Sequence, residues 1–124
     1  MWLILTTLLH FLSILPLAST NSILYSSVIL ASTLLSVLYH LYEESNGWIT
    51  ILDYGMSGVW AFYDTYLGYK YRLLHKILPT NFISCAINVL IPYNTQYVFL
   101  HSVWHILNAY KSYYIATLLS KTEL

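Results

Sequence analysis

The feature that most constrains this chain is a series of long apolar runs that carry almost no charge. No Asp, Glu, Lys or Arg occurs in the first 42 residues. Over the 124 residues, apolar side chains make up 58% and charged side chains 8%, and the mean hydropathy is +0.62. A soluble domain carries about 25% charged residues, and a chain this short cannot bury so much apolar surface inside itself. The composition therefore predicts a single-domain integral membrane protein.

We expect an all-α, polytopic membrane helix bundle of about five transmembrane helices, because about 17 to 25 apolar residues cross a bilayer as a helix. The expected spans are 2–17, 23–42, 48–69, 73–91 and 97–119. The fourth is the weakest, because Pro79 lies near its start and the stem of Lys76 must be counted. The first has the length of a signal peptide, but it lacks a basic beginning, which favours a retained span.

The basic residues predict the orientation of this bundle. All five fall on one side of it: Lys70, Arg72, Lys76, Lys111 and Lys121. The other side carries Glu43 and Glu44 and a neutral turn at 93–96. Since cytoplasmic loops carry an excess of Lys and Arg, we expect a luminal or extracellular N-terminus and a cytoplasmic C-terminus. Removing the first run as a signal peptide would put the basic loop outside, which argues against that reading.

Other features exclude further classes of protein. The net charge is zero and no basic stripe is present, so nucleic acid is not an expected partner. Cys85 is the one cysteine, so an internal disulfide cannot form and the redox compartment stays open. A homo-oligomer that completes a pocket stays open as well.

The last apolar run contains two histidines four residues apart, His101 and His105. In a helix they lie on one face, about 6 Å apart along the axis, and can bind a single metal ion. We expect His40 to supply a third ligand, because the second span ends on the side of the membrane where the third and fifth begin. If the fourth run did not cross, these imidazoles would lie at opposite membrane faces.

Counting residues from the span ends also places Asp53, Ser36 and Ser57 at about the same depth in the membrane as the three histidines. Ser36 lies four residues before His40, and Ser57 lies four residues after Asp53, so each pair shares a helix face. Each residue also has a simpler interpretation taken alone: the serines as interhelical hydrogen-bond formers and Asp53 as a helix-start residue. His10 and His75 are interpreted as interface or loop residues. An ionisable group inside a membrane is nevertheless a candidate for function.

The segments Ser36-Val-Leu-Tyr-His40, Leu52-Asp-Tyr-Gly-Met-Ser57 and His101-Ser-Val-Trp-His105 resemble the motifs of the CREST superfamily of membrane hydrolases. That group includes alkaline ceramidases, the adiponectin and progestin receptor family and the myomaker-like proteins. The three segments of this chain are most similar to those of the myomaker-like proteins. The resemblance covers about half of the chain. Family members usually have seven spans, with three between the Asp-bearing and double-histidine helices, whereas this chain has room for one.

The resemblance implies zinc bound by His40, His101 and His105, with a water in the fourth position. It also implies that Asp53 holds or deprotonates this water, that Ser36 orients it or donates to the developing oxyanion, and that Ser57 or Asp53 accepts from a ligand histidine. The expected reaction is hydrolysis of a lipid amide or ester. A zinc-stabilised membrane protein without turnover, acting in membrane remodelling or lipid sensing, stays open. A haem protein does too, although two histidines on one helix face suit haem poorly.

Overall fold

The computed structural model describes residues 1–18, 22–42, 47–90 and 96–122. The described residues form five antiparallel helical rods and contain no β-strand. The first, called the N-terminal rod here, joins α1 (Trp2–Leu8), a 3-10 helix η1 (Leu9–Ser13) and α2 (Ile14–Leu17). The other rods are α3 (Ile23–Leu41), α4 (Gly47–Lys70), α5 (Leu74–Leu90) and α6 (Tyr97–Thr122). The predicted helices are thus confirmed.

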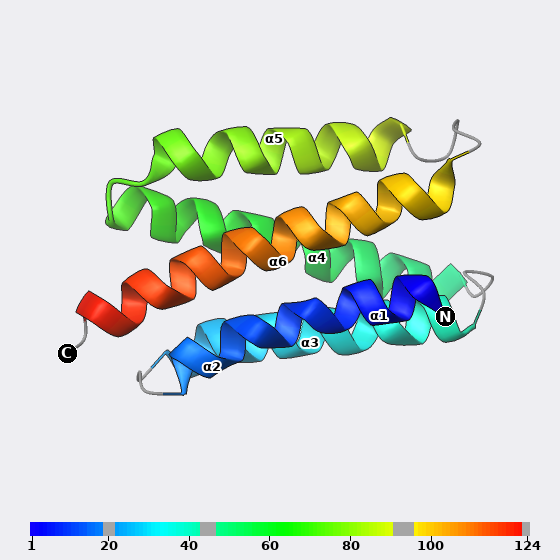
Figure 1. Cartoon of the computed structure of the whole chain (residues 1–124), viewed down its shortest axis with the longest axis horizontal. Helices are drawn as coiled ribbons and strands as arrows, with labels where there is room; N and C mark the ends of the chain where they lie inside the picture. The colour runs from blue at the N-terminus through cyan, green and yellow to red at the C-terminus, as the bar shows by residue number, and fades with distance from the viewer. Residues whose placement is uncertain (19–21, 43–46, 91–95, 123–124) are drawn as a thin grey trace.

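The rods run alternately up and down, so the bundle has two distinct ends (Figure 1). At one end, called the histidine end, the N-terminal rod begins, α3 ends, and α4 and α6 begin. At the other, called the basic end, α4 passes into α5 and α6 ends. The fourth rod, α5, is one continuous helix that lies beside α4 and α6 and does not fold back on itself (Figure 1). The acidic residues Glu43 and Glu44 and most of the polar turns at 19–22 and 93–96 lie outside the described residues.

A tight turn at the basic end sets the geometry between α4 and α5. The amide of Leu73 donates to the carbonyl of Gly68 (2.6 Å) and the amide of Arg72 to that of Tyr69 (3.2 Å), while Arg72 has a φ of 58°. This is a Schellman motif, which satisfies carbonyls left open at a helix end. A Cβ atom on Gly68 would lie 3.1 Å from Cγ1 of Ile77, so glycine lets the two helices meet this closely.

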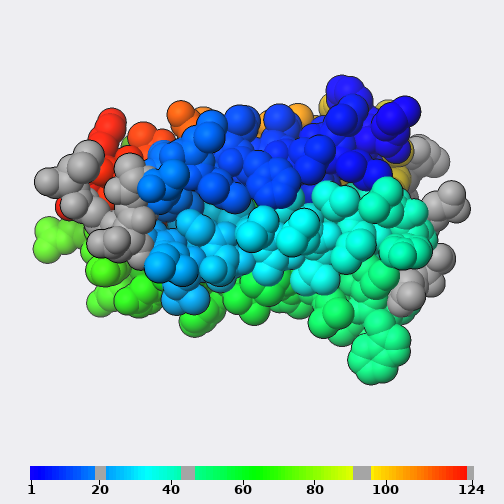
Figure 2. Space-filling view, turned by 90° about the horizontal axis from the view of Figure 1, so that it is seen from below, coloured from blue at the N-terminus to red at the C-terminus, as the bar shows by residue number. Residues whose placement is uncertain are grey.

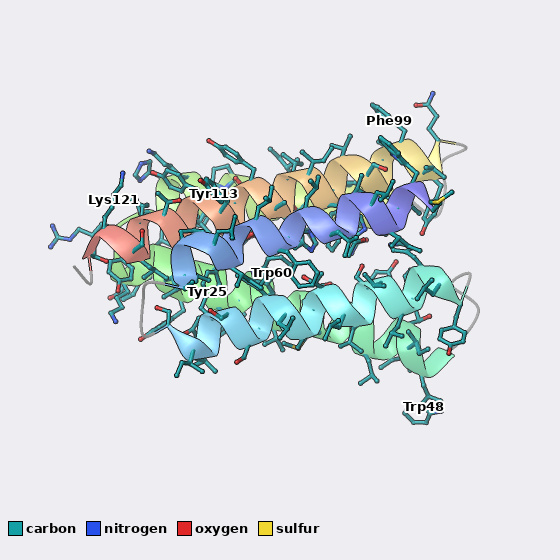
Figure 3. All side chains as sticks on the ribbon, turned by 60° about the horizontal axis from the view of Figure 1, so that its bottom comes forward. Tyr25, Trp48, Trp60, Phe99, Tyr113 and Lys121 are labelled. Carbon is teal, nitrogen blue, oxygen red and sulfur yellow. The ribbon has the colours of Figure 1, made fainter. Side chains whose placement is uncertain are left out.

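Apolar side chains cover the outside of the bundle and polar side chains gather inside it. Large apolar residues are exposed on every rod, among them Leu15, Leu24, Phe62, Phe82 and Phe99. Trp48 and Phe99 project away from the rods, whereas Tyr25 and Trp60 lie between them (Figure 3). The N-terminal rod and α3 lie side by side across one face (Figure 2). The buried apolar core consists of Leu17, Tyr25, Val28, Ile29, Trp60, Leu67, Ile77, Ile115, Ala116 and Leu119, mostly toward the basic end.

Of the described helices, only α3 is both long and apolar enough to count as a membrane span by length and composition. The N-terminal rod is apolar but shorter. The fold class is therefore an all-helical bundle, and the crossing of a membrane by all five rods stays a prediction.

A buried ion pair joins α4 to α6 inside the bundle. Lys111 Nζ lies 2.8 Å from Asp64 Oδ2, and both side chains are almost fully buried. Tyr25 of α3 donates to the other oxygen of Asp64 (2.6 Å), and Lys111 also donates to Asn81 of α5 and Asn108 of α6. This network, called the Asp64–Lys111 network here, links four of the five rods. The sequence places Lys111 among the basic residues of one side of the bundle. The structure instead pairs its charge with Asp64 inside the bundle.

Candidate metal centre

The histidine end brings together the three imidazoles that the sequence predicts as ligands. His40 lies in the last turn of α3, and His101 and His105 lie one turn apart near the start of α6. Because α3 and α6 run in opposite directions, the end of one and the beginning of the other lie at the same level (Figure 1). The convergence that was expected from counting spans is present in the fold.

The three rings are close enough to share one ion. Their ring centroids are 4.8 to 5.4 Å apart, and each offers a nitrogen within 4.8 Å of the nitrogens of the other two. The Nε2 atoms of His40 and His105 are 3.2 Å apart. Two nitrogens at 2.0–2.1 Å from a tetrahedral ion lie about 3.3 Å from each other. The nitrogens of this pair already have that spacing. The most widely separated ligand nitrogens, at most 4.8 Å apart, need to approach each other by about 1.5 Å, a displacement that side-chain rotation provides.

His101 gives the strongest indication that the cluster binds a ligand. Its side chain is 3% exposed, and neither ring nitrogen has a hydrogen-bond partner among the described residues. Nδ1 of the fully buried His105 also has none. Buried polar groups are nearly always paired, because losing water without a replacement costs about 1–3 kcal/mol. A metal ion binds one nitrogen of each imidazole, so it would satisfy one of the two open nitrogens of His101, and the donor set of three imidazoles fits a bound metal.

The N-terminal rod covers the cluster with two residues that were not predicted as part of the site. Thr7 Oγ1 lies 3.1 Å from His105 Nε2, and His10 donates from Nε2 to the carbonyl of His105 (3.2 Å). The interpretation of His10 as an interface or loop residue was wrong, because it is 1% exposed and stacks edge-on against Trp60. One turn further on, Ser13 bonds to Ser112 of α6.

A signal for this contact is present in the sequence. Thr7, His10 and Ser13 recur every three residues in an otherwise apolar run, which places them along one side of a helix. A polar stripe of this kind on an apolar helix indicates a face that is buried against another helix, since lipid offers no hydrogen-bond partners. The stripe packs against α6, which makes the first apolar run part of the bundle.

The structure places the other predicted site residues in different surroundings. Ser36 is buried one turn before His40, and its hydroxyl has no hydrogen-bond partner among the described residues. Asp53 is buried on α4, which packs against α3. Ser57 lines a separate cavity between α4, α5 and α6. The exposed His75 lies in the first turn of α5, at the basic end.

Trp104 stands between the histidines and that cavity. Its ring lies 5.0 Å from the ring of His105 and 5.6 Å from that of His101, measured between centroids. The same side chain lines the cavity, which has a volume of about 170 Å³. Ser84 also lines it, with a buried hydroxyl that has no partner among the described residues. A cavity with serine and asparagine side chains in its wall thus lies one side chain away from the metal-binding cluster.

No family model matches this sequence, and no curated protein or solved structure is significantly similar to it. The class of protein therefore rests on the residues and their arrangement. Among the described residues these are a helical bundle with one apolar span-like helix, and three histidines able to hold a metal ion, of which His101 and His105 are buried and His40 is half-buried.

Proposed function

We propose that this chain is an integral membrane protein that hydrolyses a lipid amide or ester with a zinc ion bound by His40, His101 and His105. The single observation that carries the proposal is His101, whose two ring nitrogens are buried beside two other imidazoles without any hydrogen-bond partner among the described residues. Three histidines with one further position open are typical of catalytic rather than structural zinc sites.

The distribution of side chains supports the membrane part of the proposal. Hydrophobic residues are exposed on every rod, while His10, Asp64 and Lys111 are buried. Water favours the reverse arrangement, whereas a bilayer favours this one, because polar groups there must be satisfied inside the bundle. Buried polar residues such as Asp64 of α4 and Lys111 of α6 lower the mean hydropathy of these two helices. Because these side chains face the inside of the bundle, they do not prevent the helices from presenting an apolar surface to lipid. Five crossings would put the two termini on opposite sides.

The orientation is tested by labelling each terminus. With Lys70, Arg72, Lys76 and Lys121 at the basic end, we expect that end in the cytoplasm. A glycosylation acceptor added before Met1 is expected to be modified in the secretory pathway, and one added after Leu124 is not. Extraction at alkaline pH is expected to leave the protein in the membrane pellet. Modification of both added acceptors, or of the C-terminal one alone, would contradict five crossings in this orientation.

A bound zinc ion would supply Lewis acidity toward a carbonyl and activate a water for attack on it. The chain's own residues have the remaining tasks. Asp53, the buried acid at this end, accepts the proton of the attacking water, and the open hydroxyl of Ser36 donates to the oxygen of the carbonyl under attack. The cavity beside Trp104 accommodates a polar part of the lipid, and the acyl chain lies between helices. These roles follow the resemblance to the membrane hydrolases.

Replacing Asp53 with asparagine tests whether the site turns over. We expect Asp53→Asn to lower kcat for lipid amide or ester hydrolysis by about 10²–10⁴-fold, the usual contribution of a general base. The zinc content is expected to stay near one per chain, because Asp53 is not among the three ligands. The same purified protein is used for both measurements: kcat from the hydrolysis of fluorogenic lipid amides and esters, and zinc content from elemental analysis. Full activity of this variant would remove Asp53 from the mechanism.

A second function is favoured by Thr7. Its hydroxyl lies 3.1 Å from Nε2 of His105 and could serve as a fourth ligand, and the N-terminal rod packs against the cluster on that side. A closed site of this kind suits a zinc ion that stabilises the bundle, in a protein that remodels membranes or senses lipids without turnover. Zinc at one per chain with no hydrolysis of any lipid amide or ester, in the wild type as well as in Asp53→Asn, would select this function.

A further inference from the structure

A second cavity opens between α5 and α6 toward the basic end, away from the histidines. Its volume is about 330 Å³, and it is lined by Lys76, Ile77, Thr80, Tyr110, Lys111 and Tyr114. We propose that this cavity binds the phosphate of an anionic phospholipid. The inference rests on the membrane embedding proposed above, and it needs neither the metal nor the reaction.

The ammonium group of Lys76 is held in place at this cavity. Its Nζ donates to the hydroxyl of Tyr114 (2.9 Å) and lies 5.1 Å from the centroid of the same ring. An ammonium has three donors, so Lys76 keeps donors for an anion while one of its protons fixes the side chain. The other cation in the wall, Lys111, is neutralised by Asp64. One excess positive charge therefore faces the cavity.

The charges around the cavity favour an anion. Lys70, Arg72 and Lys121 lie at the same end of the bundle. Of the two acidic residues within the described ranges, Asp64 is paired with Lys111 and Asp53 lies nearer the histidine end. A basic pocket between helices at the cytoplasmic interface is a typical site for an anionic lipid head group.

An adjoining apolar groove distinguishes a lipid from a free phosphate. Tyr110 separates the cavity from a second hollow, which is lined by Leu9, Leu12, Ile106, Ala109, Tyr110 and Tyr113. This hollow has a volume of about 240 Å³ and lies between the N-terminal rod and α6. Its lining on α6 begins at Ile106, one turn further from the basic end than Tyr110, where the lining of the cavity begins. A phosphate beside Lys76 and an acyl chain in the groove would be one continuous ligand. The head group would then lie at the interface and the chain deeper in the membrane.

The experiment measures lipid enrichment around the protein in nanodiscs. With a mixture of phosphatidylcholine and phosphatidylglycerol, native mass spectrometry of wild-type protein is expected to retain phosphatidylglycerol at least fivefold over its bulk share. Lys76→Gln is expected to remove most of this enrichment. Lys70→Gln is the matched control, because Lys70 lies 5.4 Å over the ring of Tyr71 at the same end but does not line the cavity. The control is expected to retain the wild-type enrichment.

Three outcomes would overturn the inference. The first is equal retention of both lipids by the wild type. The second is an equal loss in Lys70→Gln and Lys76→Gln, which would indicate attraction by general charge. The third is thermal stabilisation by inorganic phosphate that depends on Lys76 and matches that by phosphatidylglycerol, which would indicate a site for free phosphate. Circular dichroism of each variant reports on folding, and a variant that retains the wild-type helical signal has kept the bundle intact. Zinc content, measured on the same samples, reports separately on the proposed function.

Discussion

Replacing His101 with alanine is expected to abolish metal binding by the purified protein. The zinc content should fall from about one per chain to below a tenth, since losing one of three ligands weakens binding by more than the 10–100-fold that outer contacts contribute. His101 is the most informative position because its ring nitrogens have no other partner among the described residues. Its removal therefore breaks no hydrogen bond that the structure contains.

The measurement compares two variants that carry the same histidine-to-alanine substitution at different positions in the bundle. His101→Ala and His75→Ala each remove one imidazole, but His75 is exposed at the start of α5, far along the bundle from the cluster. Elemental analysis after purification without added metal should show zinc in His75→Ala and the wild type alone. Added zinc should also raise the Tm of those two proteins by several degrees and leave that of His101→Ala unchanged. Equal zinc in both variants would place the metal elsewhere.

The histidine cluster could be predicted from the sequence because it depends on only two regularities. The spacing of His101 and His105 fixes a shared helix face, and counting rods fixes which helix ends meet. Both regularities survive errors of a few residues at helix boundaries, such as the end of α6 at Thr122 instead of residue 119. His40 therefore falls at the correct level without any knowledge of how α3 and α6 pack.

The contacts of the N-terminal rod could not be predicted in the same way. Counting rods places Thr7 and His10 near the histidine end, but it does not say which neighbours the rod touches. That choice depends on the packing of several helices at once, and the rod turns out to lie against both α3 and α6. Tertiary packing also decides that His10 faces inward, toward Trp60, and not toward the membrane interface.

The Asp64–Lys111 network was missed for a different reason. A charge inside a membrane helix is expected to pair with another, and these two residues have opposite signs. Counted from the expected span ends at the basic side, however, Asp64 is five residues from residue 69 and Lys111 eight from residue 119. At 1.5 Å per residue this suggests depths that differ by about 4.5 Å. The different extents of the two helices at this end remove that difference.

Breaking this ion pair is expected to cause a large loss of stability. Asp64→Asn leaves Lys111 charged and buried without its carboxylate, and removing one partner of a buried pair typically costs 3–5 kcal/mol. Lys111→Met should cost a similar amount, because it leaves Asp64 uncompensated. The free energy of unfolding is measured in mixed micelles by titration with a denaturing detergent, with circular dichroism as the signal.

The double variant separates the charge from the packing. Asp64→Asn with Lys111→Met removes both charges, so it should be more stable than either single variant by about 2 kcal/mol. Full recovery is not expected, because the side-chain amide oxygens of Asn81 and Asn108 lose the ammonium that donates to them. Lys121→Met, at an exposed position of α6, should change the free energy by less than about 0.5 kcal/mol. Strictly additive losses in the double variant would mean that the two charges do not interact, and Asp64 and Lys111 would then have to be buried for separate reasons.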